Sequence, residues 1–154
     1  VAKALNKEVL GPDYEITVAD LEAAQKLAGL EISEGDVVLI GTGWSKNWEN
    51  KDLYQGQSLG TPGIGEAGAK WLAAKKPRAC GGETIAFEHI PAGAGHRELP
   101  VHRVFLVETG IHIIETMKLD ELADTGVNEF LFVLTPLNLQ GATGSPTRPL
   151  AVLV

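Results

Sequence analysis

His102 and Glu115 are the two side chains in this sequence whose types and spacing best suit a shared metal ion. Val101 to Thr109 is expected to form a short helix closed by Gly110, and Ile111 to Glu115 a strand. Seven helical steps cover about 10 Å, and four strand steps cover about 13 Å. A chain reversal at Gly110 would therefore return Glu115 to the start of the helix, beside His102. A divalent metal can bind there, although a catalytic zinc needs three protein ligands.

Glu115 is informative because Ile111, Ile113 and Glu115 share one face of the expected strand. The isoleucines predict that this face points inward, and a buried carboxylate is costly unless it is paired or bound to a metal. A salt bridge, or a strand end that emerges into solvent, remains an alternative for Glu115. For His102 the alternative is a capping or surface histidine, which spacing alone favours. Three other histidines carry weaker signals: His89, His96 and His112.

Two further groups of residues are candidates for a site. Glu83 and Glu88 flank a short apolar stretch, where one of them can support a metal ligand or move a proton; the alternative is a pair of solvated loop carboxylates. Trp44, Trp48 and Tyr54 cluster in a long polar segment. Such a segment can wall a pocket for a flat substrate, or its aromatic rings can simply pack on one another.

Composition and motifs exclude several classes of function. The formal net charge is −7 and no basic stripe is present, so nucleic acid is not an expected partner. No apolar run approaches the roughly 18 residues of a membrane helix, and no signal peptide is visible. Gly141 to Pro146 lacks the ending of a phosphate loop, and Ser145 lacks the context of a nucleophile elbow. The single cysteine, Cys80, excludes a cysteine-rich zinc site and is expected in the core.

Strands and helices are expected to alternate along residues 1–154, which predicts one domain of the α/β class. The first half should contain a helix from Val18 to Leu27, with Thr17 and Asp20 as a capping box, and a strand buried on both faces from Asp36 to Thr42. A loop from Gly43 to Gly60 should follow, and then a helix that starts at Thr61-Pro62. Besides the helix and strand around Gly110, the second half should contain these elements: a short strand within Arg78 to Phe87, a helical turn from Leu119 to Asp124, and strands at Glu129 to Leu134 and Leu150 to Val154.

An ordered set of motifs resembles the cyclase family of metal-dependent hydrolases, which includes enzymes similar to kynurenine formamidase and isatin hydrolase. The match runs from about Ile16 to the end of the chain, and each motif alone is weak. The segments that carry it are Gly35 to Ile40 with Thr42-Gly43-Trp44, Pro62 to Gly65 with Trp71 to Ala73, Gly82-Glu83-Thr84 with Phe87-Glu88, Leu99 to Arg103, Gly110 to Glu115, Leu119 to Ala123, and Gly141 to Pro146 with Arg148-Pro149.

The resemblance implies an α/β fold of the swivelling β/β/α type, usually in a homo-oligomer, with zinc or manganese as the divalent metal. It implies that His102 and Glu115 are metal ligands, and that the loop carrying Trp44 and Trp48 binds substrate. It places Glu83-Thr84 and Glu88 where relatives often have Asp-Thr and then Glu, so Glu83 is a small departure; Glu83 and Glu88 are the expected catalytic residues.

The family's main metal motif, His-x-Gly-Thr-His-x-Asp, is absent from these 154 residues. Three explanations are open: the residues precede Val1, another chain supplies them, or the chemistry has been lost. The absence of an initiator Met favours the first, so we expect the C-terminal portion of a cyclase-like domain whose N-terminal part is missing.

The expected function is hydrolysis of a small amide, cyclic amide or lactone by metal-activated water, in the cytoplasm. The alternative is a non-catalytic binding module that retains the fold without a complete metal site. A third possibility is an interaction fragment that needs a partner chain to complete its sheet.

Overall fold

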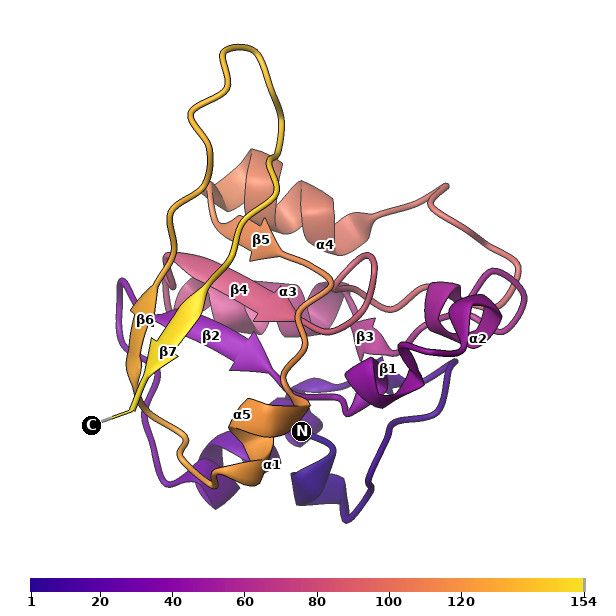
Figure 1. Ribbon diagram of the computed structural model, residues 1–154, viewed down its shortest axis with the longest axis horizontal. Helices are drawn as coiled ribbons and strands as arrows, with labels where there is room; N and C mark the ends of the chain where they lie inside the picture. Colours follow the sequence, from indigo (N-terminus) through magenta and orange to yellow (C-terminus); the bar gives the residue numbers. More distant parts are fainter. Residues whose placement is uncertain (154) are drawn as a thin grey trace.

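Three parallel strands form the central sheet of the protein, which the computed structural model describes over residues 1–153 (Figure 1). The strand order is β2 (Val37–Ile40), β4 (Ala79–Gly82) and β5 (His112–Ile114), with β4 in the middle. All three run in the same direction, and crossover segments that contain helices connect them. The expected α/β class is therefore confirmed.

Strand β4 consists of small residues because its neighbours close over it. A Cβ atom added at Gly81 would lie 2.9 Å from the sulfur of Met117, 3.0 Å from a methyl group of Leu39 and 3.1 Å from Cβ of Ile114. Glycine in a strand interior is otherwise unfavourable and often marks such a close approach. Side chains from both sides of the strand therefore meet above Gly81.

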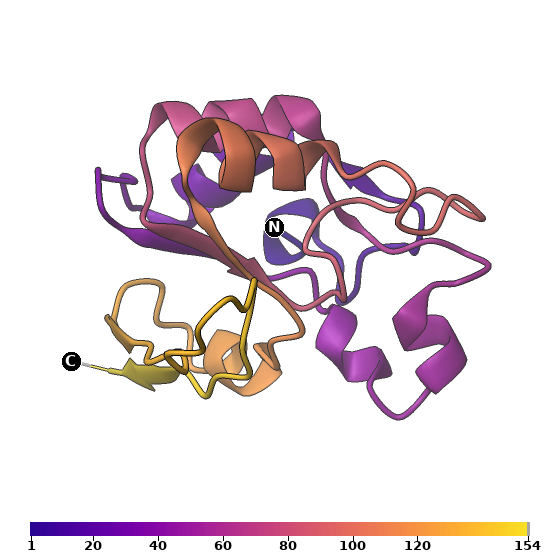
Figure 2. The ribbon, with the colours of Figure 1, turned by 90° about the horizontal axis from the view of Figure 1, so that it is seen from above.

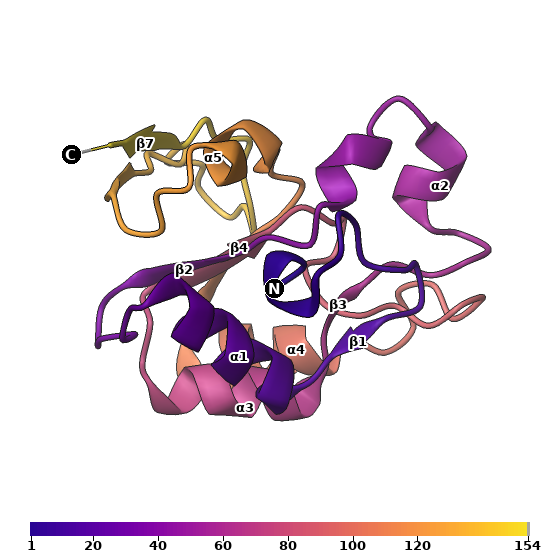
Figure 3. The ribbon, with the colours of Figure 1, turned by 90° about the horizontal axis from the view of Figure 1, so that it is seen from below.

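Helices cover one face of this sheet, and a smaller C-terminal layer covers the other (Figures 2 and 3). The helical layer contains α1 (Val18–Ala28), α3 (Glu66–Ala74), α4 (Pro100–His102) and η3 (Arg103–Thr109), a π-helix that continues α4. The C-terminal layer contains α5 (Asp120–Asp124) and the antiparallel pair β6 (Leu131–Val133) and β7 (Leu150–Val152). The chain also forms η1 (Lys3–Leu5) and a parallel pair of short strands, β1 (Glu15–Ile16) and β3 (Gly63–Ile64).

The main hydrophobic core lies between the sheet and the helical layer. Its fully buried members include Leu72 of α3, Phe105 of η3 and Cys80 of β4. Burial raises the pKa of the Cys80 thiol to about 12, as expected for a core cysteine. Strand β2 lies at the edge of the sheet, with Val38 against the main core and Val37 and Leu39 against a smaller cluster on the opposite face, and all three are only partly buried. The expectation of a strand buried on both faces was therefore wrong for β2.

Helix α1 begins and ends where its sequence signals predict. The side chain of Thr17 accepts a hydrogen bond from the Asp20 backbone, and the Asp20 carboxylate accepts one from the backbone of Thr17. This reciprocal capping box is confirmed. Gly29 ends the helix in a left-handed conformation, with φ of 67°.

Two expectations about the middle of the chain were wrong. The segment 43–60 is not a plain loop but contains η2 (Trp44–Asn47) and α2 (Lys51–Gln55), the latter capped by the side chain of Asn50. No helix starts at Thr61-Pro62. Thr61 instead pairs with Ile90, and β3 follows, so α3 begins only after Gly65. Pairing between distant segments overrode the helix-start signal of Pro62.

In the second half of the chain, each expected helix and strand is present as a helix or strand, with small differences in its ends. Gly110 closes the α4–η3 segment with φ of 71°. The predicted end of the last strand at Val154 lies outside the described residues. Over residues 1–153, none of the helices has the length and apolar character needed to cross a membrane.

Candidate metal-binding site

Glu88 is a fully buried carboxylate that organises the start of α4. Its Oε2 accepts a hydrogen bond from the backbone N–H of Val101 at 3.0 Å, and its Oε1 accepts one from the backbone N–H of His102 at 3.1 Å. These are free N–H groups of a first helical turn, which normally need a capping side chain. A residue distant in sequence thus caps the helix that carries His102.

The same carboxylate orients the His102 ring. Nδ1–H of His102 donates to Oε1 of Glu88 at 2.5 Å, while Nε2 lies 3.2 Å from Oε1 of Glu115. Glu88, His102 and Glu115 therefore form a continuous chain of polar contacts. The meeting of His102 and Glu115 expected from the lengths of helix and strand is confirmed, although their role as metal ligands stays a prediction.

Glu115 differs from the sequence expectation in one respect. Strand β5 ends at Ile114, so Glu115 lies just beyond the strand with 36% of its side chain exposed, while Glu88 is buried. The inward strand face predicted for Glu115 was therefore wrong, because the chain turns at Thr116.

Backbone strain adjoins both carboxylates of this chain. Phe87, next to Glu88, has φ of 60°, and Thr116, next to Glu115, has φ of 58°. Bulky and β-branched residues rarely adopt this left-handed region, and such outliers cluster at functional sites. Backbone hydrogen bonds from Thr116 to the carbonyl of Thr84 and from Met117 to that of Gly82 hold the second turn in place.

The two flanking carboxylates change the acidity of His102. Glu115 first, and Glu88 second, raise the pKa of His102 to about 9 against the opposing effect of burial. The imidazole is therefore protonated at neutral pH in the metal-free protein. A metal ion at Nε2 would have to displace that proton, which couples metal affinity to pH.

We expect this coupling to appear as a loss of stability in alkaline solution. The folded-state pKa of His102 lies above the unfolded value of about 6.5. The stabilisation is therefore fully present below pH 6.5 and is lost as the pH rises through 9, by on the order of 1–3 kcal/mol. Urea unfolding of metal-free protein between pH 6 and 10, with an NMR titration of the His102 ring, measures both effects. A His102→Gln variant should lose this part of the pH dependence, and a His102 pKa at or below 6.5 would contradict the assignment.

Glu83 lies in a separate network beside the segment that carries Trp44. Its Oε2 accepts hydrogen bonds from N and Oγ1 of Thr42, at 2.6 and 2.7 Å, and from N of Gly43 at 2.7 Å. Its Oε1 accepts one from Oγ of Ser45 at 2.6 Å. The carboxylate is buried and fully engaged with the turn that follows β2. Sequence patterns do not identify Thr42 and Ser45 as partners of Glu83; the one signal is that hydroxyl side chains follow directly after a strand.

The aromatic side chains of this segment divide between packing and exposure. Trp44 is 1% exposed and its indole N–H donates to the carbonyl of Tyr54 at 3.0 Å. Trp48 is 50% exposed and its ring meets that of Tyr54 edge-on, with centroids 5.0 Å apart. Tyr54 in turn donates its hydroxyl to the carbonyl of Glu83 at 2.6 Å. Of the two predicted substrate-binding residues, Trp48 is thus the accessible one; the binding role of both stays a prediction.

The structure therefore brings His102, Glu115 and Glu88 together and leaves Glu83 in a different network. Over residues 1–153, no three His, Cys, Asp or Glu side chains gather in a way that would hold a metal ion by themselves. The catalytic role predicted for Glu83 and Glu88 stays a prediction; both carboxylates are engaged with protein donors.

A family model described as "Putative cyclase" matches residues 2–89, more than half of the chain. The chain therefore belongs to the cyclase family.

Solved structures and curated proteins agree with this assignment. A structure described as a novel cyclase superposes with a TM-score of 0.86 and 30% identity, covering 99% of this chain and 51% of that one. An isatin hydrolase bound to the product analogue thioisatinate superposes with a TM-score of 0.74 at 24% identity, covering 90% of this chain and 53% of that one, which supports the fold.

Among curated proteins, the isatin hydrolase of Roseibium aggregatum is 27% identical over 145 residues, which are 92% of this chain and 54% of that protein. Cyclase-like protein 2 of Oryza sativa subsp. japonica is 30% identical over 103 residues, which are 66% of this chain and 35% of that protein. The chain thus spans about half the length of the first of these relatives and about a third of the second.

Proposed function

We propose that this chain is part of a metal-dependent hydrolase that acts on a small amide, cyclic amide or lactone. The observation that carries the proposal is the contact chain Glu88–His102–Glu115, in which one imidazole nitrogen meets a buried carboxylate and the other meets a partly exposed one. A histidine that ligates a metal commonly donates its second N–H to a carboxylate in this way. The relatives named isatin hydrolase support the same reaction class.

The residues present fit two positions of a metal site. His102 Nε2 and the Glu115 carboxylate converge on one point, and a nitrogen–oxygen donor pair suits zinc or manganese. A catalytic site needs at least one more protein ligand, and over residues 1–153 no third candidate joins the pair. We therefore propose that the pair supplies two ligands and that further ligands come from polypeptide beyond these residues.

Each residue would have a separate task in hydrolysis. A divalent metal would supply Lewis acidity towards the substrate carbonyl. Glu88 would fix the His102 ring with Nε2 directed at Glu115, and Glu83 would hold the turn before Trp44 and Trp48. Trp48, half exposed on Tyr54, would offer an aromatic surface to a flat substrate such as isatin. A small-molecule substrate, a homo-oligomeric state and a cytoplasmic location belong to the same proposal.

Metal binding by the purified chain tests the half-site directly. We expect titration calorimetry with Zn²⁺ or Mn²⁺ to show weak binding that weakens about tenfold or more in His102→Gln or Glu115→Gln, since each substitution removes a ligand. His112→Gln is the matched control, because His112 is an exposed histidine on the adjacent strand. Equal metal affinity in the His102→Gln and His112→Gln variants would refute the half-site.

An assay of hydrolysis distinguishes an enzyme from the alternative, a non-catalytic binding module. The full-length protein has to be assayed, because these residues supply only two of the proposed ligands; isatin and N-formylkynurenine are suitable substrates, followed by ultraviolet absorbance with metal present. Turnover that His102→Gln abolishes would support the hydrolase, whereas metal binding without turnover of either compound would favour a non-catalytic binding module.

A further inference from the structure

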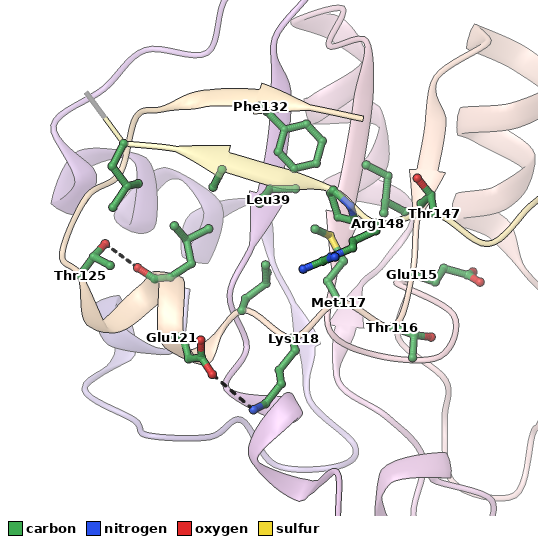
Figure 4. Close-up of a pocket in the computed structure, with 16 residues that line it drawn as sticks. Leu39, Glu115, Thr116, Met117, Lys118, Glu121, Thr125, Phe132, Thr147 and Arg148 are labelled. Atoms are coloured by element: carbon green, nitrogen blue, oxygen red, sulfur yellow. Dashed lines mark hydrogen bonds and ion pairs between the residues drawn. The ribbon is translucent and has the colours of Figure 1, made fainter. Parts of the chain in front are cut away.

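A cavity of about 500 Å³ lies on the sheet face opposite the helical layer, between β2, the segment after β5, and the β6–β7 pair (Figure 4). This volume falls within the range of small-molecule sites, roughly 300–1,000 Å³. Its apolar walls include Leu39 of β2, Met117 beyond β5, and Phe132 of β6. These side chains belong to the second hydrophobic cluster, between the sheet and the C-terminal layer.

Arg148 is the notable polar group of this cavity. It lies two residues before β7, it is exposed, and Figure 4 shows its guanidinium beside the Met117 side chain at the cavity. Within residues 1–153 its side chain forms no ion pair or hydrogen bond, whereas Arg103 pairs with two glutamates. The guanidinium of Arg148 is thus a cation placed against apolar walls without a carboxylate partner from the described chain.

Other charged groups at the cavity limit what this cation can bind. Nζ of Lys118 lies 3.7 Å from Oδ2 of Asp120 and 3.8 Å from Oε1 of Glu121, so these carboxylates largely offset its charge. Glu115 and Glu121 both line the cavity. They would repel a ligand with several negative charges, and this favours a single anionic group at Arg148.

We propose that this cavity binds a small apolar monocarboxylate. The carboxylate pairs with the Arg148 guanidinium, whose planar fork matches two carboxylate oxygens. An aryl or branched alkyl body occupies the space between Leu39, Met117 and Phe132. The site goes beyond the proposed hydrolase function and needs no metal. Glu115 lies at the edge of this cavity, and in Figure 4 its side chain points away from the guanidinium.

Calorimetry or methyl NMR with phenylacetate and its neutral analogue phenylacetamide tests this site. We expect the wild-type chain to bind phenylacetate more tightly than phenylacetamide, and Arg148→Gln to weaken phenylacetate binding about tenfold or more. Binding of phenylacetamide should not change in this variant. The Met117 methyl resonance should shift on binding, because that side chain lines the cavity.

Three further variants make the result decisive. Arg97→Gln removes an exposed arginine outside this cavity and should leave phenylacetate binding unchanged. His112→Gln changes an exposed histidine outside this cavity and should also leave it unchanged. Ala151→Leu adds bulk to the cavity lining and should weaken both probes. Equal affinity for the two probes, or phenylacetate binding that Arg148→Gln does not weaken, would overturn the proposal.

Discussion

Replacing Glu83 with alanine is expected to lower the free energy of unfolding by about 3–5 kcal/mol. The buried carboxylate accepts four hydrogen bonds from the turn after β2, two of them from backbone N–H groups of Thr42 and Gly43. Alanine would leave these donors without an acceptor, and a buried unpaired donor costs its full desolvation energy. Urea unfolding at neutral pH gives the change directly.

Glu83→Gln is the matched variant because it keeps one acceptor oxygen in place. Three of the four hydrogen bonds converge on Oε2, so an amide oxygen there retains them, and only the contact with Ser45 has to reverse its direction. We expect a cost of about 1–2 kcal/mol. Glu22→Ala, at an exposed site on α1, should change stability by no more than about 0.5 kcal/mol. A cost for Glu83→Ala as small as that of Glu22→Ala would contradict the network.

The second large effect is expected at Glu88, where capping and titration can be separated. Glu88→Ala removes the acceptor of the Val101 and His102 backbone N–H groups and should cost about 3 kcal/mol. Glu88→Gln removes the charge and keeps an acceptor oxygen for only one of the two N–H groups, since that of Val101 meets Oε2 and that of His102 meets Oε1. The pKa of His102 should then fall from about 9 towards its ordinary value, although Glu115 still holds it above 6.5.

An NMR titration of His102 in both variants measures this shift, with urea unfolding as the parallel readout. Glu115→Gln provides the contrast: it should lower the pKa of His102 and remove only the stabilisation linked to that shift, about 1 kcal/mol, because Glu115 is partly exposed and the backbone N–H groups of the first turn keep Glu88 as their acceptor. The account fails if Glu88→Gln leaves the His102 pKa near 9, or if Glu88→Ala and Glu115→Gln have equal effects on stability.

Local sequence signals, and the lengths of one helix and one strand, were sufficient to predict part of this structure. The capping box at Thr17 and Asp20 is a contact between neighbours, so their types and spacing define it. The meeting of His102 and Glu115 depends on one reversal at Gly110 and on two segments of similar length. Both features arise within one supersecondary unit, and sequence patterns describe such units well.

The features that sequence reasoning did not reach depend on distant contacts. Glu83 meets Thr42 across 41 positions, and no pattern near either residue indicates the pairing. Pro62 resembles the first residue of a helix, yet the pairing of Thr61 with Ile90 keeps this segment extended. For Trp44 the sequence left two possibilities, a pocket wall or local packing. The ring is buried, and its indole N–H donates to the carbonyl of Tyr54, a contact ten positions along the chain.

The strand order of the central sheet has a consequence for how fast the chain folds. Every pairing within that sheet joins segments far apart in sequence, since Val37 pairs with Ala79, and Ala79 with His112. No hairpin exists within it to nucleate the pairing locally, so long loops must close before any strand contact stabilises them. Because β4 is the middle strand, neither β2 nor β5 can pair within this sheet until β4 is in place. The sheet should therefore form slowly and cooperatively, and His102 can meet Glu115 only after β5 has joined β4.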